Sequence, residues 1–184
     1  MAEPVVVYTI GHSNHPADHF LKLLSRHRIQ AVVDVRTSPY SRYTPHFNGK
    51  ALQSLLPQHG LEYVFAGTVL GGRPSDPVYY KAGVVPEGKG DYLKLVDYPA
   101  IARADWFDRG IQRLLHIAQA RATAMMCSEE DPLRCHRHHL IEMSLRERGA
   151  SVVHIRRDGS LETIDPAESC AEPTPQLSLL GFGG

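Results

Sequence analysis

The sequence has little cysteine, no excess of either charge and no long apolar run, and each shortage excludes a class of protein. Three cysteines in 184 residues do not make a disulfide framework of the kind that small secreted domains use. Twenty basic and twenty acidic residues cancel, so no overall field draws the chain to nucleic acid or to an anionic membrane. Binding to either would need a local patch.

No apolar run approaches the length of a membrane span, and no basic stretch followed by an apolar one marks a signal peptide. We therefore expect a cytoplasmic protein without a membrane partner, in which the cysteines stay as thiols. Hydrophobic residues make up 42% of the chain and charged residues 22%, a balance typical of a globular domain with a sizeable core.

Short apolar runs alternate with amphipathic stretches along most of the chain. Strands are predicted at residues 5–10, 30–35, 61–65, 122–126 and 151–155, and helices at 16–28, 49–59, 105–120 and 132–149. Ser13 or Asn14, Asp105 and Asp131 are the expected helix caps, and Gly149 is the expected stop of the last helix. This alternation predicts an α/β fold with a mostly parallel sheet flanked by helices.

The C-terminal part contains a hairpin signal and then a change of composition. Asp158-Gly159 predicts a hairpin with an antiparallel edge strand over 160–164. From Pro166 onward the composition is that of a flexible tail. The sequence thus predicts one α/β domain over residues 1–165 and a tail over 166–184. Within the domain, the long segments 36–48 and 68–90 are expected to have a function.

The segment from Cys127 to Arg137 is the richest in chemistry. It places two thiols, three carboxylates, an imidazole and two guanidinium groups within eleven residues, between a predicted strand and a predicted helix. Because it follows the carboxyl end of a strand, it lies where open α/β sheets bind ligands. We expect a site there.

Four motifs, taken together and in this order, are similar to those of one known family. They are Thr9-Ile-Gly-His-Ser13, Asp34-Val-Arg36, Leu70-Gly-Gly72 and Cys127-x-Glu129-x-Asp131-Pro132-x-x-Cys135-His136-Arg137. Over roughly residues 5 to 157 the chain resembles the bacterial domain-of-unknown-function family 488, DUF488. The resemblance implies an α/β fold and a shared pocket that carries these motifs. It implies no activity, so function is argued from the residues.

Three of these motifs follow predicted strands and are expected to meet at one edge of the sheet. We predict that a single pocket is lined by Ser13, Asp34, Arg36, Glu129, His136 and Arg137. Helix N-termini near Ser13 favour an anion, and the two arginines suit phosphate. Two alternatives stay open: Asp34 forms a structural ion pair with either arginine, and Ser13 only caps a helix.

Two carboxylates are the preferred catalytic candidates. Glu129 and Asp34 can divide the acid and base roles, with His12 and His136 as proton relays. Alternatively, Glu129 accepts hydrogen bonds within its own turn, and His136 is a half-buried structural histidine. No cofactor is evident, and it stays open whether a divalent metal binds at the two carboxylates.

Cys127 raises the hypothesis of a nucleophile of the phosphatase or rhodanese type. Six residues separate it from Arg134, no glycine opens the loop, and three neighbouring carboxylates would repel a phosphate. A small buried hydrophobe is the preferred interpretation of Cys127. A zinc site of Cys127, Cys135 and His136 is also weighed, but the spacing lacks a Cys-x-x-Cys knuckle and shows only three ligands.

Two further segments suggest nucleic acid and its machinery. Tyr40, Arg42 and Tyr43 offer rings for base stacking and a cation for phosphate. In the tail, the pentapeptide 176–180 resembles the peptide by which bacterial replication and repair proteins bind the sliding clamp. The alternative is that this peptide packs on its own domain. The expected clamp contacts are Gln176, Leu177, Leu179 and Leu180.

Together these features predict an enzyme of DNA or nucleotide maintenance that hydrolyses an N-glycosidic or phosphoester bond. Glu129 or Asp34 would activate water, and Arg36 and Arg137 would hold phosphate. Two alternatives stay open: a small-molecule thiol or phosphate enzyme that uses Cys127, and a binding module for nucleotide or DNA without catalysis.

Overall fold

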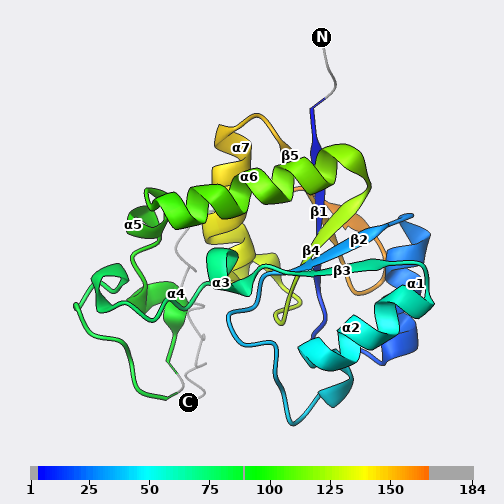
Figure 1. The fold of residues 1–184 in the computed structure, drawn as a ribbon, viewed down its shortest axis with the longest axis horizontal. Helices are drawn as coiled ribbons and strands as arrows, with labels where there is room; N and C mark the ends of the chain where they lie inside the picture. The colour runs from blue at the N-terminus through cyan, green and yellow to red at the C-terminus, as the bar shows by residue number, and fades with distance from the viewer. Residues whose placement is uncertain (1–3, 89, 166–184) are drawn as a thin grey trace, which may run out of the picture.

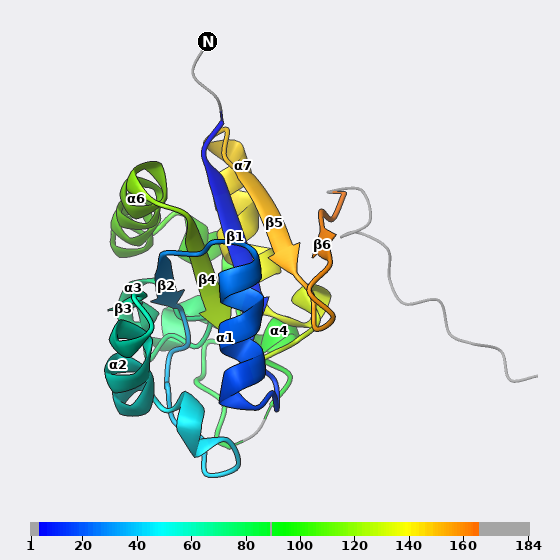
Figure 2. The same cartoon turned by 90° about the vertical axis from the view of Figure 1, so that its right-hand side faces the viewer.

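A computed structural model describes residues 4–88 and 90–165. Its centre is a six-stranded sheet with the order β3-β2-β4-β1-β5-β6. The first five strands run parallel, and β6 pairs antiparallel with β5 at the edge of the sheet, on the right of Figure 2. The predicted α/β class and hairpin are confirmed. The strands are β1 (Val6–Gly11), β2 (Ala31–Asp34), β3 (Glu62–Phe65), β4 (Thr123–Cys127), β5 (Ser151–Ile155) and β6 (Leu161–Glu162).

Helices cover both faces of this sheet (Figure 1). Alternate strand residues face opposite layers, so Val32 packs with α1 and α2 whereas Val33 packs with α3, α5, α6 and α7. The two apolar cores lie between the sheet and these layers. The helices are α1 (Ala17–Arg26), α2 (Gly49–Gln58), α3 (Gly67–Leu70), α4 (Tyr92–Leu95), α5 (Tyr98–Ala102), α6 (Asp105–Ala120) and α7 (Met143–Glu147).

Two of the predicted caps are wrong. Ser13 has a left-handed backbone with φ of 46°, because a tight turn follows β1 and His15 N–H donates to His12 O at 3.1 Å. Helix α1 therefore begins after Pro16, with no side-chain cap. In α6 the cap position belongs to Ala104, and Asp105 is the first helical residue, where its charge favours the helix dipole.

The predicted helix over 132–149 is interrupted near its start. Asp131 caps only a 3-10 turn, Pro132–Arg134, by accepting from Leu133 N–H at 3.0 Å. Cys135 is then extended, with φ of −137°. The helical run begins at His136, passes through a π-helical segment, Arg137–Glu142, and continues as α7. Gly149 follows with φ of 77°, so the predicted stop is confirmed.

The segment before α6 is more ordered than the sequence predicts. It contains α3, α4, α5 and a 3-10 turn, Pro77–Tyr79, joined by a bridge between Tyr80 and Val96. Within the described part of the chain, no helix is long and apolar enough to cross a membrane. The peptide with Gln176, Leu177, Leu179 and Leu180 lies outside the described residues.

Candidate functional site

A cavity of about 960 Å³ lies at the carboxyl ends of the parallel strands, the edge where α/β sheets bind ligands. Four segments far apart in the sequence form its walls: residues 36–40, 72–73, 90–98 and 127–136. Of the predicted site residues, the cavity brings together Arg36, Tyr40, Cys127, Glu129 and His136. The second and third of these segments also supply Arg73, Lys94 and Tyr98, which were not among the predicted site residues.

Three of the six residues predicted to share one pocket do not line this cavity: Ser13, Asp34 and Arg137. Asp34 is fully buried, and its carboxylate binds Arg36 through Oδ1 to Nε at 2.8 Å and Oδ2 to Nη2 at 2.6 Å. Tyr63 donates a third hydrogen bond to Oδ2 at 2.9 Å. Asp34 therefore forms the structural ion pair that the sequence left as an alternative.

His12 completes the environment of Arg36. Its Nε2 accepts from Arg36 Nη1 at 2.9 Å, so the proton is on Nδ1, which donates to Ser13 O at 2.8 Å. Burial and the neighbouring guanidinium lower the pKa of His12 to about 4. Both ring nitrogens are engaged and the ring stacks on Phe47, which gives His12 a positioning role rather than a place in the cavity.

Arg137 is buried and binds the protein's own backbone. Its guanidinium donates to Glu129 O and, at 2.7 Å, to Glu130 O. Arg137 therefore does not lie where it could make the predicted phosphate contact in the cavity. These bonds instead hold the loop that carries Glu129.

Gly11 lets the same loop approach the end of β1. A Cβ at this position would lie 1.8 Å from Glu129 O. The close approach allows His12 N–H to donate to Cys127 O at 2.9 Å and Ser13 N–H to donate to Ser128 O at 2.8 Å. The glycine of the Thr9-Ile-Gly-His-Ser13 motif is thus required by backbone packing.

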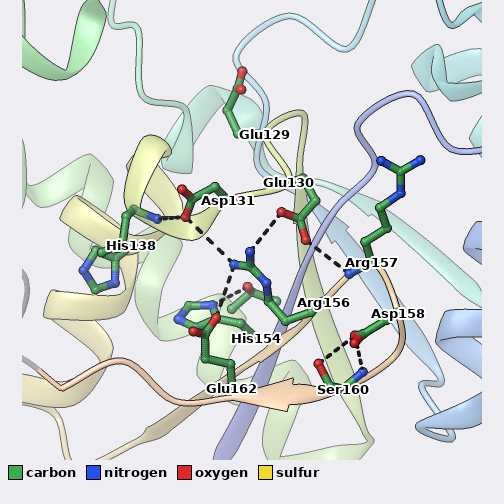
Figure 3. A network of polar contacts seen from close by, with 12 residues as sticks. Glu129, Glu130, Asp131, His138, His154, Arg156, Arg157, Asp158, Ser160 and Glu162 are labelled. Carbon is green, nitrogen blue, oxygen red and sulfur yellow. Dashed lines mark hydrogen bonds and ion pairs between the residues drawn. The ribbon is translucent and has the colours of Figure 1, made fainter. Parts of the chain in front are cut away.

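The three neighbouring carboxylates have different roles. Figure 3 shows Glu130 and Asp131 directed toward Arg156, while Glu129 points away from this network. Glu130 lies 3.0 Å from Arg156 Nη2 and accepts from Arg157 N–H at 3.1 Å. Across residues 4–88 and 90–165, no hydrogen bond or ion pair engages the exposed carboxylate of Glu129, so this group is open to a ligand.

Two thiols and an imidazole converge at the inner wall of the cavity. Cys127 is the last residue of β4, and the extended backbone at Cys135 brings Cys135 and His136 beside Cys127. The Sγ atoms of both cysteines lie 3.7 Å from His136 Nδ1. His136 Nε2 lies 3.2 Å from both Val35 O and Leu70 O. Because carbonyl oxygens only accept, Nε2 carries the proton and the Nδ1 lone pair faces the thiols.

The two thiols are not equivalent. Burial raises the pKa of Cys135, but the hydrogen bond with Cys127 and the charge and N–H of Arg137 outweigh it and bring the pKa to about 7. The hydrogen bond with Cys135 and burial raise the pKa of Cys127. Burial and the two thiols also raise the pKa of Tyr98, which lines the same cavity. Cys135, which the sequence analysis considered only for zinc, is the thiol closer to ionisation.

Cationic and aromatic side chains surround the mouth of the cavity. Arg73 lies over the ring of Tyr92 at 4.1 Å, and the guanidinium of Arg134 makes no hydrogen bond or ion pair with any residue that the structure describes. Tyr40 is 74% exposed at the rim. The predicted stacking residues Arg42 and Tyr43 lie on the same segment, with the guanidinium 4.8 Å from the ring centre, but outside the cavity lining.

Comparison with protein families matches residues 16–144 to the model described as "Domain of unknown function DUF488". The chain belongs to the DUF488 family. The match confirms the predicted resemblance and covers every segment that lines the cavity. No curated protein and no solved structure matches this DUF488 chain. Its activity is therefore argued from the geometry of the cavity.

Proposed function

We propose that this protein is a hydrolase that cleaves a phosphoester or N-glycosidic bond in a nucleotide or in DNA. One observation supports the proposal: Glu129 has a carboxylate without a hydrogen-bond or ion-pair partner among the described residues, and it lines a cavity of about 960 Å³ together with Arg73 and Arg134. A carboxylate can take a proton from water, and guanidinium groups bind phosphate.

Glu129 suits the role of general base because it is open while its backbone is held. Arg137 binds the carbonyl groups of Glu129 and Glu130, and Gly11 packs against the same carbonyl of Glu129. The carboxylate therefore extends from a restrained loop, which a base needs if it is to orient a water molecule. Asp34, the other carboxylate of the original hypothesis, is occupied by Arg36.

The phosphate contacts of the proposal differ from those that the sequence predicted. Arg36 lines the cavity but is held by Asp34 and Phe47 O, and Arg137 binds backbone. Arg134 and Arg73 have no carboxylate partner within the described ranges, so their charges are available to an anionic substrate. Tyr40, exposed at the rim, adds a ring on which a base can stack.

The test is turnover by the Glu129→Gln variant. Nucleoside 5′-phosphates and short single- and double-stranded DNA serve as substrates, and released phosphate, free base and cleaved strand are measured by chromatography. We expect Glu129→Gln to lower turnover by about 100-fold or more, since it loses the base and keeps the side-chain volume.

Glu130→Gln is the matched control. It makes the same chemical change one residue away, in a carboxylate directed to Arg156 outside the cavity, so turnover should change little. Full turnover by Glu129→Gln, or no hydrolysis of any of these substrate classes by the native chain, would overturn the proposed function.

A further inference from the structure

We propose that Cys127, Cys135 and His136 form a binding site for a soft divalent cation, Zn²⁺ in particular, with one coordination position open to the cavity. The three donor atoms, Sγ, Sγ and Nδ1, all lie within 4.8 Å of one another. Each sulfur is 3.7 Å from Nδ1. Bonds of about 2.0–2.3 Å around a tetrahedral zinc separate sulfur and nitrogen ligands by roughly 3.5 Å, so only small movements are needed.

The orientation of His136 supports a ligand role. Its Nε2–H is shared by Val35 O and Leu70 O, which leaves the Nδ1 lone pair directed at the two thiols. Metal-binding histidines in proteins donate their second nitrogen to a carbonyl or carboxylate in this way, which sets the tautomer and the ring orientation. Gly72 packs on the same ring, because a Cβ there would lie 2.4 Å from His136 Cγ.

The surroundings of Cys135 favour the thiolate that a metal requires. Arg137 N–H lies 3.5 Å from Cys135 Sγ. Two thiolates and one Zn²⁺ sum to zero charge, so the loaded site would not leave a net charge among buried residues. Cys127 and Cys135 are both buried and free of disulfide, which suits the low-dielectric setting of thiolate sites.

The open position distinguishes this arrangement from a closed structural zinc site. A structural site uses four protein ligands, whereas a catalytic site uses three and holds water or substrate in the fourth position. Cys127, Cys135 and His136 line the same cavity as Glu129. If the proposed function holds, a Zn²⁺ held by these three residues would lower the pKa of a bound water, and Glu129 would take the proton. The hydroxide would bond to the phosphorus or glycosidic carbon of the substrate while the bond from that atom to the departing group breaks, and the departing group would receive the proton from Glu129.

A second buried group with metal-ligand chemistry is less suited to a cation. His138, Glu142 and His154 also bring donor atoms within 4.8 Å. Its carboxylate, however, is already bound by the Arg146 guanidinium at 2.7 Å, which repels a cation. None of these three residues lines the cavity. We therefore assign the metal to the thiol group alone.

The first test adds Co²⁺ to the full chain after removal of metal with a chelator. Co²⁺ bound at this site gives a thiolate charge-transfer band and the strong visible bands of tetrahedral cobalt. We expect one Co²⁺ per chain, displaced by Zn²⁺, and an affinity lowered by about 100-fold or more in Cys127→Ser, Cys135→Ser and His136→Gln. Cys170→Ser is the matched control, since it removes the third thiol and should leave the bands unchanged.

X-ray absorption of the Zn²⁺-loaded native chain keeps the inference testable if a ligand variant fails to fold. We expect two sulfur atoms and one imidazole in the coordination shell, in the native chain and in Cys170→Ser alike. A shell without sulfur, bands that survive in the Cys127→Ser, Cys135→Ser double variant, or no metal bound would each overturn the site.

The outcome for the metal is separable from the outcome for the proposed function. Turnover that depends on Glu129 in a chain that binds no metal would reject the metal site and keep the hydrolase. One bound Zn²⁺ with two sulfur ligands, together with full turnover by Glu129→Gln, would keep the metal site and reject Glu129 as the base.

Discussion

Asp34 binds Arg36 where both side chains are almost fully buried. The exposed fractions are 0% and 4%, and the two groups share two hydrogen bonds. Removing one member of a buried pair leaves the other charge without its partner, which costs far more than the loss of an exposed pair. At the scale of single residues, burial and the pairing with Arg36 give the Asp34 carboxylate a structural role, whereas the exposed carboxylate of Glu129 stays available for chemistry.

Asp34→Asn should therefore destabilise the fold. We expect the free energy of unfolding to fall by about 3 kcal/mol, because Arg36 stays buried without a counter-charge. Denaturant unfolding at neutral pH measures the change. Glu62→Gln is the control: Glu62 pairs with Arg121 at the surface, both being more than 40% exposed, and its loss should cost less than about 1 kcal/mol. Equal effects of the two changes would contradict the structural role of Asp34.

The end of β1 and the loop after β4 act together at the scale of elements. Gly11 permits the contact, and the backbone bonds of His12 and Ser13 join β1 to the loop. Gly11→Ala would push a methyl group into Glu129 O. We expect a loss of about 3 kcal/mol in the free energy of unfolding, together with lower turnover, since the loop that carries the base must move.

Gly60→Ala is the comparison for this prediction. Gly60 has φ of 70° and open space where a Cβ would lie, so only the backbone conformation is penalised, by about 1 kcal/mol. Thermal unfolding of both variants distinguishes the two cases. A Gly11→Ala protein as stable as Gly60→Ala would show that the loop moves away without cost.

Glu142 links the helical run from His136 to strand β5. Its Oε1 accepts from Arg146 Nε at 2.9 Å, and its Oε2 lies 2.6 Å from His138 Nδ1. His154 Nε2 lies 3.1 Å from Oε2 but forms no hydrogen bond with it. Burial raises the pKa of Glu142, but these partners outweigh it and lower the pKa to about 2.

The depressed pKa of Glu142 predicts acid sensitivity. The ionised carboxylate stabilises the fold above its unfolded pKa of about 4.5, and this contribution of about 3 kcal/mol is lost as the pH falls toward 2. Glu142→Gln should lower stability at neutral pH and flatten its decline between these values. Denaturant unfolding across this pH range tests it, with exposed Glu147→Gln as a control that should follow the native curve.

At the scale of the whole molecule, the cavity exists because the strand order brings distant segments to one edge. The ends of β2 and β4 are neighbours in the sheet, where Asp34 pairs with Met126 although the two lie 92 positions apart in the sequence. Residues 72–73 and 90–98 then close the cavity from the α6 and α7 side. No single segment contains the site.

Binding of the peptide 176–180 to the sliding clamp is also predicted at the scale of the whole molecule. The full chain should bind the bacterial sliding clamp with a Kd of roughly micromolar order, and the Gln176→Ala, Leu179→Ala double variant should lose binding, because such peptides use few anchors. Calorimetric titration measures it. Unchanged affinity of the double variant for the clamp would contradict recruitment to replicating DNA through this peptide. As a control, the native chain and the double variant should hydrolyse free nucleotides at equal rates.

The α/β class, the parallel strands and the hairpin could be predicted from the sequence, because these follow from signals within a few residues. Apolar periodicity predicted the strands, Gly149 predicted the end of the last helix, and Asp158-Gly159 predicted the turn of the hairpin. The same local reasoning found the Cys127 to Arg137 segment and the family motifs. It also selected Arg36, Glu129 and His136, which the structure places at one cavity.

Which side chains remain available to a ligand depends on the tertiary structure. Arg137 binds backbone carbonyls, Asp34 is occupied by Arg36, and Cys135 lies beside Cys127 because the predicted helix is broken at Cys135. These outcomes depend on where segments far apart in the sequence meet and on which polar groups must be satisfied once they are buried. A local pattern carries no information about those partners, so the sequence could name some of the site residues but not which of their side chains stay free.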